Sequence, residues 1–483
     1  MKIRLIGIFC LLSFQVWAQQ ELNPISSAGR PGLSVTSCTD YQAQGINPAN
    51  LGIEPSYDGM HQTMGFTELG FSAFSNGMGK FNLKSSLLDG ERVLSGQDKN
   101  QAAIDLSGKR ITANLDFLFA GYAWQRVSGG SGFSFTIREK VQWFSSFNPS
   151  LASILFNGSK DKTYFDSPIL SQRLDSTNGQ IITDTLGAMA KEGRPLAEVF
   201  KDSKVAMSWN REFAFAYGVN VINGLEWKIN LGVGIKYVEG IGYVDIQSDG
   251  NNFKAFVASS PYFDLKYGNN GGLTRAKDSV NGGVWPNAVG HGIGFEVGTT
   301  IIYKDRIRIS VALSDLGSVV YNTNVYVAPN TILTEIRNTG FTHYDFYNDT
   351  RQMDGAQKDI LEWQGTSKKS KPLPTKLRFG IAYTKEKWQI GLETILPMNA
   401  SAGNFQKPLV SIGGEVLLLE WLKVGTGIVY GGNVDQILVP FGLNFITSGG
   451  LWEMGIGFRD VISYTRDTSP MLSLCTGVMR FRF

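Results

Sequence analysis

The end of the chain alternates with a period of two residues, the spacing at which side chains leave a β-strand. Met479, Phe481 and Phe483 fall on one face, and Val478, Arg480 and Arg482 fall on the other. An apolar face opposite a cationic one, ending in an aromatic residue, is typical of the last strand of a barrel in lipid. The same parity predicts that Cys475 faces lipid, whereas Cys38 lies in the N-terminal segment. Two unpaired cysteines that act as small apolar residues are therefore favoured over a disulfide between them.

The beginning of the chain is typical of a secretory signal. Lys2 and Arg4 precede an apolar run from Leu5 to Val16, and cleavage is expected after Ala18. We therefore predict an exported protein with a signal peptide at residues 1–18, an N-terminal segment at 19–59 and a membrane barrel at 60–483.

Composition narrows the class of protein further. Outside the signal, no apolar run approaches the roughly 20 residues that a spanning helix needs. The 56 glycines and the 12% of aromatic residues favour twisted antiparallel sheet. Because the net charge is only +3 with both signs interspersed, nucleic acid is not expected as a partner.

Alternating blocks divide the rest of the chain into fourteen expected strands. The blocks are residues 60–74, 112–126, 132–144, 205–221, 225–247, 289–303, 306–318, 376–384, 387–396, 409–419, 423–430, 436–445, 451–459 and 472–483. Short and long connections alternate between them, with one exception at 431–435. Since outer-membrane barrels have short periplasmic turns and long outer loops, we predict an all-β membrane protein, a 14-stranded antiparallel outer-membrane β-barrel of a Gram-negative cell with both termini periplasmic.

Charges indicate which face of each strand points inward, because Lys or Arg at the midplane of a barrel wall costs about 2–4 kcal/mol. The charged residues expected to line the lumen are Glu296, Arg308, Arg378, Glu393, Glu415 and Glu453. They are expected to pair with one another across the lumen, and the alternative is that they orient a passing or bound ligand. A barrel of this size is too wide to be filled by its own wall residues, so something must occupy the space.

The segment at residues 19–59 is long enough to plug the lumen from the periplasmic side. It is rich in Gly, Pro, Ser and Asn and has no sustained periodicity. Within it, Asn47 can cap a helix and Pro48 suits the first helical position, so residues 45–51 predict a turn that opens a short helix.

Several short motifs in the chain resemble those of a known family. They are Asn47-Pro48-Ala49 after the signal, Ser314–Gly317 at a strand end, Pro374–Gly380 at a strand start, and the ending Arg480–Phe483. With them the chain resembles uncharacterised Bacteroidota barrels of the long-chain fatty-acid channel (FadL-like) and PorV-like superfamily, in which Asn47, Pro48 and Ala49 match the hatch motif. The resemblance implies a channel for hydrophobic substrates or, in the PorV-like branch, a shuttle of type IX secretion. The long loops at 145–204 and 319–375 depart from both patterns, so no ligand or partner residues are carried over.

Catalysis is not expected. Nucleophilic hydrolysis needs a nucleophile and a histidine base within hydrogen-bond reach. His61, His291 and His343 are assigned to opposite ends of strands and to a loop, so they cannot share one site. Neither paired cysteines nor histidine–carboxylate spacings indicate a metal, and no cofactor is predicted.

One loop segment predicts an amphipathic helix. Residues 148–158 begin with a capping Asn, continue with Pro and with apolar residues at helical spacing, and stop at Gly. Leu151, Ile154, Leu155 and Phe156 would either pack as a lid over the barrel mouth or form an outer vestibule that captures an apolar ligand.

These patterns support two functional hypotheses. The first is passive uptake or binding of a hydrophobic or amphipathic small molecule, gated by displacement of the hatch. The alternative is a non-transporting barrel that serves as a docking or shuttle partner of a type IX secretion or surface-assembly complex. In either case outer-membrane lipid and lipopolysaccharide are expected to surround the barrel.

Overall fold

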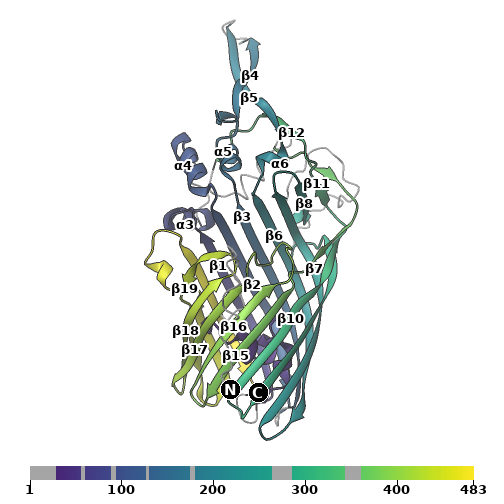
Figure 1. Ribbon diagram of the computed structural model, residues 1–483, viewed down its shortest axis with the longest axis vertical. Coiled ribbons are helices and arrows are strands. Elements are labelled where there is room, and N and C mark those ends of the chain that lie inside the picture. The colour runs from purple at the N-terminus through teal and green to yellow at the C-terminus, as the bar shows by residue number, and fades with distance from the viewer. Residues whose placement is uncertain are drawn as a thin grey trace, which may run out of the picture.

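A closed antiparallel barrel dominates the computed structural model (Figure 1). The structure describes residues 29–55, 60–88, 94–126, 130–174, 180–263, 285–342 and 360–483, so the expected signal peptide lies outside the described residues. Within these ranges fourteen strands form the ring. In order they are β1 (Gln62–Ser75), β2 (Arg110–Gln125), β3 (Ser131–Ser146), β6 (Lys204–Asn223), β7 (Trp227–Ser248), β9 (Gly290–Tyr303), β10 (Ile307–Tyr321), β15 (Lys376–Lys385), β16 (Trp388–Pro397), β17 (Leu409–Leu419), β18 (Leu422–Gly431), β20 (Phe441–Ile446), β21 (Trp452–Phe458) and β22 (Met471–Arg482).

The ring closes between the first and last strands, where Phe66 lies opposite Met479 and Phe74 opposite Met471. The strand number and antiparallel order predicted from the sequence are therefore confirmed. One predicted strand is divided, because residues 436–445 contribute to β19 (Val434–Leu438) and β20, with Pro440 between them. Proline lacks the N–H that a ladder needs, which explains the interruption.

Connections of different length separate the two ends of the barrel. The short-turn rim carries the links of three to five residues between β6 and β7, β9 and β10, and β20 and β21, and the chain ends there at Phe483 (Figure 1). The long-loop rim carries α3 (Lys80–Leu88), α4 (Gly96–Leu106), α5 (Pro149–Asn157) and α6 (Leu196–Val199). Among the described residues, no helix has both the length and the apolar character required to cross a bilayer.

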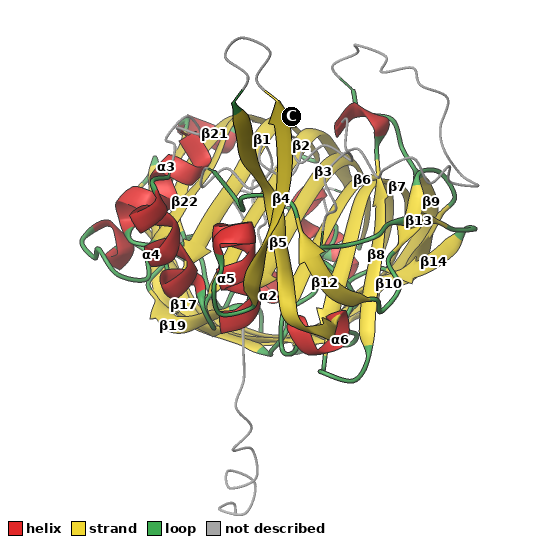
Figure 2. Ribbon diagram, turned by 90° about the horizontal axis from the view of Figure 1, so that it is seen from above, coloured by secondary structure: helices red, strands yellow, loops and turns green. Residues whose placement is uncertain are grey.

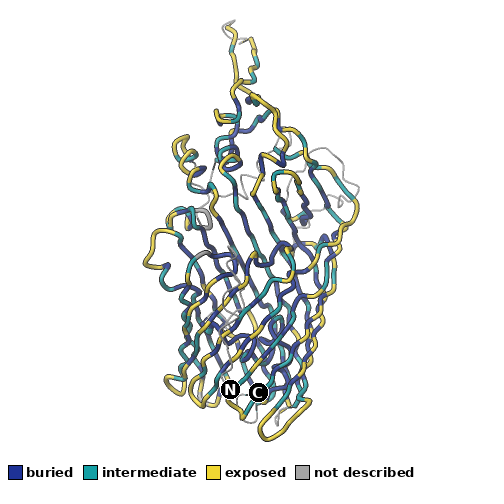
Figure 3. Tube along the Cα trace, viewed as in Figure 1, coloured by how far each residue is buried: buried dark blue, intermediate teal, exposed yellow. Residues whose placement is uncertain are grey.

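The outward face of the strands is apolar and exposed. Along β7, Leu231, Val233 and Ile235 point away from the lumen and alternate with buried residues. At the short-turn rim, aromatic rings pack side by side, with 4.4 Å between the ring centroids of Trp227 and Tyr303. An apolar band bordered by aromatic rings is the surface that a barrel presents to lipid. Figure 3 shows the alternation of burial along the wall.

The predicted parity of the last strand holds from Met479 to the end of β22 but is wrong on the N-terminal side of Met479. Cys475 is 1% exposed and lies on the inner side, whereas Val478 and Met479 are both exposed. β22 carries one extra residue relative to β21 at this point, and Thr67 in the adjoining part of β1 has a φ of 51°. An extra residue of this kind reverses the alternation, so residues on its two sides follow opposite parities. No disulfide joins Cys38 to Cys475.

The long loops form a layer of their own above the barrel (Figure 2). β4 (Phe165–Leu174), β5 (Ile181–Pro195) and β12 (Ile332–Ile336) make a separate three-stranded sheet, called the arm below. β8 (Phe253–Ser259), β11 (Val325–Val327), β13 (Gln364–Gly365) and β14 (Lys369–Pro372) extend the barrel sheet upward from β7 and β10.

Candidate functional site

Residues 29–53, called the plug below, run through the lumen in the half nearer the short-turn rim. The segment contains one short helix, α2 (Ser34–Ser37), and two 3₁₀ turns, η1 (Asp40–Ala43) and η2 (Pro48–Gly52). Almost all of its side chains are buried, including those of polar residues such as Asn47 and Asn50. Because buried polar groups are costly unless they are hydrogen-bonded, the contacts of the plug with the wall determine how firmly it is held.

The wall is lined with glycine where the plug backbone approaches it. A Cβ atom at Gly391 of β16 would lie 2.4 Å from the carbonyl oxygen of Gly32, and one at Gly232 of β7 would lie 2.2 Å from the backbone nitrogen of Ala49. Comparable contacts with the plug occur at Gly65, Gly121, Gly132, Gly218, Gly298, Gly380, Gly413, Gly425, Gly427 and Gly442. The lumen therefore accommodates the plug only because these positions lack side chains.

Three of the glutamates predicted to be lumenal contact the plug directly. Glu415 pairs with Arg30 at 3.1 Å. Glu393 accepts hydrogen bonds from the hydroxyl of Ser34 at 2.6 Å and from its backbone nitrogen at 3.0 Å. Glu296 accepts one from the backbone nitrogen of Gly45 at 2.9 Å. These carboxylates stabilise the docked plug.

The fourth glutamate predicted to be lumenal, Glu453, belongs to a cluster beside the seam between β22 and β1. Arg480 of β22 donates to Glu453 at 2.9 Å and also pairs with Asp40 of the plug. Beside them, the hydroxyl of Tyr41 donates to Glu68 of β1. The strands that close the barrel thus also hold the plug.

The predicted hatch residues lie at the opposite side of the plug. The Asn47 side-chain oxygen accepts from the nitrogen of Ala49 at 3.1 Å, and its amide donates to Thr300 of β9 at 2.8 Å. Pro48 occupies the first position of η2, as its capping neighbour predicts. The segment forms a 3₁₀ turn, and the gating role of these residues stays a prediction.

Above the plug, charged side chains form a buried layer. Lys236 of β7 is 1% exposed, and its ammonium lies 2.5 Å from Asp315, 2.9 Å from Glu296 and 3.3 Å from Glu212. Lys140 of β3 pairs with Glu212 at 3.0 Å. The predicted lumenal residue Arg378 is also fully buried and pairs with Glu393 at 3.6 Å, whereas Arg308 is half-buried on the inner face of β10.

A loop between β16 and β17, residues 398–408, obstructs the lumen nearer the long-loop rim and is called the crossing loop below. The nitrogen of Ala402 donates to the hydroxyl of Tyr243 of β7 at 3.2 Å, and Gln406 accepts from Lys204 of β6 at 3.2 Å. A Cβ atom at Gly403 would lie 2.6 Å from the side-chain oxygen of Gln142 of β3. Since β3, β6 and β7 stand across the ring from β16 and β17, the loop spans the lumen.

A small polar chamber lies against the inner face of the barrel wall. Its lining residues are Asn114, Leu115, Asp116, Lys140, Gln142, Asn210, Glu212, Asp315, Pro374 and Lys376. Charged residues of both signs make the chamber suited to a small polar group.

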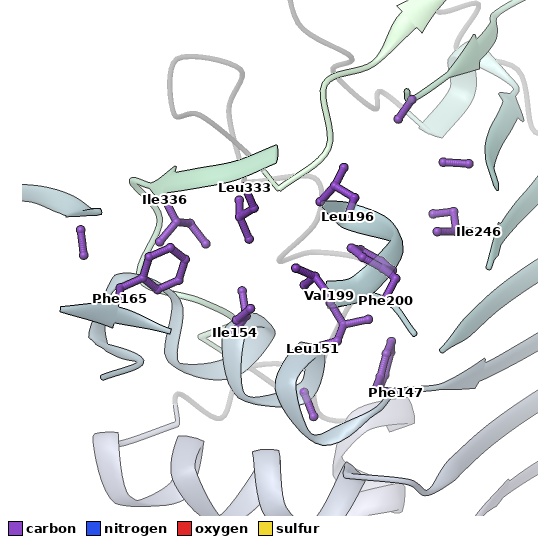
Figure 4. Close-up of a cluster of buried hydrophobic side chains, with 14 residues drawn as sticks. Phe147, Leu151, Ile154, Phe165, Leu196, Val199, Phe200, Ile246, Leu333 and Ile336 are labelled. Carbon is purple, nitrogen blue, oxygen red and sulfur yellow. The ribbon is translucent and has the colours of Figure 1, made fainter. Parts of the chain in front are cut away.

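The predicted outer vestibule is wrong. Helix α5 forms as expected, but the side chains of Leu151, Ile154 and Phe156 are fully buried. Figure 4 shows Leu151 and Ile154 packed beneath Leu333 and other apolar residues from α6 and β12. Leu155 is half-buried against the same cluster, so these residues stabilise the loop layer and present no capture surface.

The two histidines that the structure describes, His61 and His291, do not form a common site. His61 lies at the short-turn rim, where its nitrogen donates to the carbonyl of Phe483 at 2.8 Å. His291 is exposed on the outer face of β9, where its Nδ1 lies 2.7 Å from the hydroxyl oxygen of Tyr237. His343 lies outside the described residues.

Sequence reasoning missed the partners that the plug supplies. Ser34 and Glu393 are 359 positions apart, and Asp40 and Arg480 are 440 apart. No local pattern predicts such pairs. Lys236 could have been found, because it follows Asn230, Gly232 and Gly234 on the inward parity of its strand.

Distant structural likenesses accompany this architecture. The toluene transporter TodX of P. putida is 11% identical, with 95% of this chain and 96% of that chain covered and a TM-score of 0.39. The Ralstonia pickettii toluene transporter TbuX is 12% identical, with 95% of this chain and 97% of that chain covered and a TM-score of 0.42. A Pseudomonas aeruginosa FadL homologue is 11% identical, with 97% of this chain and 98% of that chain covered and a TM-score of 0.36. The PorV-like branch and a Bacteroidota origin remain predictions.

The family assignment comes from the sequence itself. A search of curated proteins found no match. The model of a family of unknown function, DUF5723, matches residues 169–425. Since this match spans more than half of the 483 residues, the chain belongs to that family.

Proposed function

We propose that the chain is a barrel of the Gram-negative outer membrane that binds a hydrophobic or amphipathic small molecule and lets it pass passively. Its exposed apolar band and aromatic border support placement in lipid. In this proposal the short-turn rim faces the periplasm and the long loops face outward. The polar chamber favours an amphipathic ligand, whose polar group would lie among the charges while its apolar part lies against rings such as Tyr243 and Tyr321.

The observation that carries the proposal is the way in which the lumen is closed. The plug and the crossing loop both lie inside a complete barrel, and the contacts described above are hydrogen bonds, ion pairs and packing contacts. Neither segment contributes a strand to the ring. Displacement of the plug, together with that of the crossing loop, therefore opens a path without breaking the barrel wall, which supports the hatch hypothesis.

A reversible cross-link between plug and wall tests this mechanism. A Cβ atom at Gly380 of β15 would lie 2.3 Å from Cγ1 of Val35, so cysteines at these two positions can be joined by a disulfide once the plug shifts slightly from the wall. The crowding that Gly380→Cys introduces is the same in the oxidised and the reduced protein, so comparing these two forms isolates the effect of the cross-link. The protein would carry Val35→Cys and Gly380→Cys, with Cys38→Ala and Cys475→Ala to remove the native thiols. Uptake of a fluorescently labelled fatty acid into vesicles containing this protein would then be measured before and after reduction.

We expect uptake to be lost in the oxidised protein and restored by reduction. The two single-cysteine proteins serve as matched controls and should respond to neither treatment. Equal uptake by the oxidised and reduced forms would show that the plug does not need to move.

The docking alternative is favoured by one observation, the exposed apolar surface of the arm. Leu174 at the end of β4 is 70% exposed, and Ile181 at the start of β5 is 66% exposed. The arm projects from the loop layer away from the barrel (Figure 1). The outer part of the arm is formed by β4 and β5 alone, and such a ribbon with exposed apolar residues suits contact with another protein.

Charge placed at the tip of the arm tests the alternative. If the arm recruits a secretion or surface-assembly protein, Leu174→Asp with Ile181→Asp should abolish recovery of that protein with a tagged barrel. Fatty-acid uptake should stay unchanged. Recovery of the same protein with and without the substitutions would rule out docking through the arm.

A further inference from the structure

Lysines gather on the inner face of the sheet at the long-loop rim. Lys204 of β6 and Lys254 of β8 both lie opposite Gln247 of β7, so they flank it on one face. In the next row on that face, Asp245 stands between Ala206 and Phe256. Tyr243 continues the face and contacts the crossing loop, which identifies it as the lumenal side.

Two further lysines reach the same place from β14. The Lys371 ammonium lies 3.7 Å from the Asp245 carboxylate and 4.1 Å from the centre of the Phe256 ring. Lys369 lies two residues earlier, opposite Tyr321 of β10. Four lysines thus lie on the strands near Asp245, and the five side chains together carry a net charge of +3.

The lysines repel one another in this arrangement. Burial lowers the pKa of Lys371, and the nearby charges of Lys254 and Lys369 lower it further, although Asp245 opposes the change. A negatively charged ligand would relieve this repulsion. Lys254 and Lys369 are exposed, so a solute can reach them.

The number of charges indicates what such a ligand looks like. Lys204 and Lys254 start from strands that are two spacings apart, about 9–10 Å between their backbones. A solute with several anionic groups can neutralise more of the four lysines than a single carboxylate can. Phe256, Tyr243 and Tyr321 provide an apolar floor beneath the charges.

We propose that this lysine cluster, Lys204, Lys254, Lys369 and Lys371, binds a soluble solute that carries at least two phosphate or carboxylate groups. The cluster faces the lumen and not the lipid, which distinguishes its ligand from the phosphates of lipopolysaccharide. Binding does not require passage through the barrel, so the proposal stands or falls separately from the uptake mechanism.

Calorimetric titration of the purified full-length protein with inorganic tripolyphosphate at low ionic strength tests the proposal. Lys254→Gln and Lys371→Gln should each weaken binding by about tenfold or more, since each removes a charge-assisted contact. Asp245→Asn should tighten binding, because it removes the carboxylate that competes with the ligand. Damage to the fold would not produce this gain.

Lys191→Gln on β5 of the arm is the matched control, because Lys191 is an exposed lysine of the loop layer outside the cluster. The affinity of this control variant for tripolyphosphate should equal that of the unmodified protein. The proposal would be overturned if Lys191→Gln lost as much affinity for tripolyphosphate as the cluster variants. It would also be overturned if Lys254→Gln and Lys371→Gln kept their affinity, or if Asp245→Asn bound more weakly. Lysine-dependent binding of lipopolysaccharide without binding of tripolyphosphate would overturn it too. Retained binding in the oxidised cross-linked protein would separate this site from the uptake path.

Discussion

The plug and the crossing loop both obstruct the lumen, but different forces hold them. The plug contacts the wall through ion pairs such as Arg30–Glu415 and Asp40–Arg480 and fits against glycines. The crossing loop reaches the far wall through hydrogen bonds to Tyr243 and Lys204. Removing one partner of a buried ion pair costs about 3–5 kcal/mol, whereas a typical hydrogen bond contributes about 0.5–1.5 kcal/mol.

This difference indicates that the two obstructions open at different cost. The crossing loop should open more often than the plug and admit a solute to the chamber. The plug should open rarely, so it should determine whether the solute continues. Hydrogen exchange resolved by peptide separates the two segments, because each lies in its own stretch of sequence.

The largest expected effect follows the loss of the seam cluster. Arg480→Ala removes the partner of both Asp40 and Glu453, and we expect the plug to lose about 3–5 kcal/mol of protection against hydrogen exchange. Asp40→Asn should show a smaller loss, because the Arg480–Glu453 pair within the barrel remains. Unchanged exchange of residues 29–53 in Arg480→Ala would contradict the role given to this cluster.

An intermediate effect is expected when a side chain is added to the glycine-lined wall. Gly391→Ala places a methyl group against the backbone of Gly32, which should destabilise the docked plug by about 1–3 kcal/mol. Gly96→Ala is the matched control, since nothing lies within 4 Å of that position. If the amide hydrogens of residues 29–53 exchange at the same rate in both variants and in the unmodified protein, the close approach of Gly391 to Gly32 does not limit docking of the plug.

The smallest effect concerns the crossing loop. Tyr243→Phe keeps the ring contacts with Phe256 and Tyr321 but removes the hydrogen bond to Ala402. We expect faster exchange in residues 398–408, corresponding to about 0.5–1.5 kcal/mol, and no change in the plug. A simultaneous change in the plug would show that the two segments are coupled.

The sequence predicted the wall because the wall is periodic. The alternation that places Glu393 and Glu415 inward follows from the cost of a charge in lipid, and the ends of β15 to β18 lie within a residue or two of the predicted ends. The prediction for Cys475 was wrong, because the extra residue in β22 is defined by how the strand pairs with its neighbours and cannot be recognised from the local sequence pattern.

The site was less predictable than the wall. The capping pattern at Asn148 predicted helix α5, but its burial depends on Leu333 and Ile336, which lie far along the chain. The plug was expected to fill the lumen, yet its pairing with particular wall residues depends on contacts between distant positions. These contacts decide that the lumenal glutamates hold the plug.

Single-channel conductance tests the central claim, that two segments close the lumen in series. Four proteins would be compared in planar bilayers: the unmodified chain, one lacking residues 29–53, one with residues 398–408 replaced by a short glycine-rich turn, and one with both changes. We predict large, persistent conductance only in the protein with both changes, and small or brief openings in the other three. Full conductance after deletion of the plug alone would contradict closure in series.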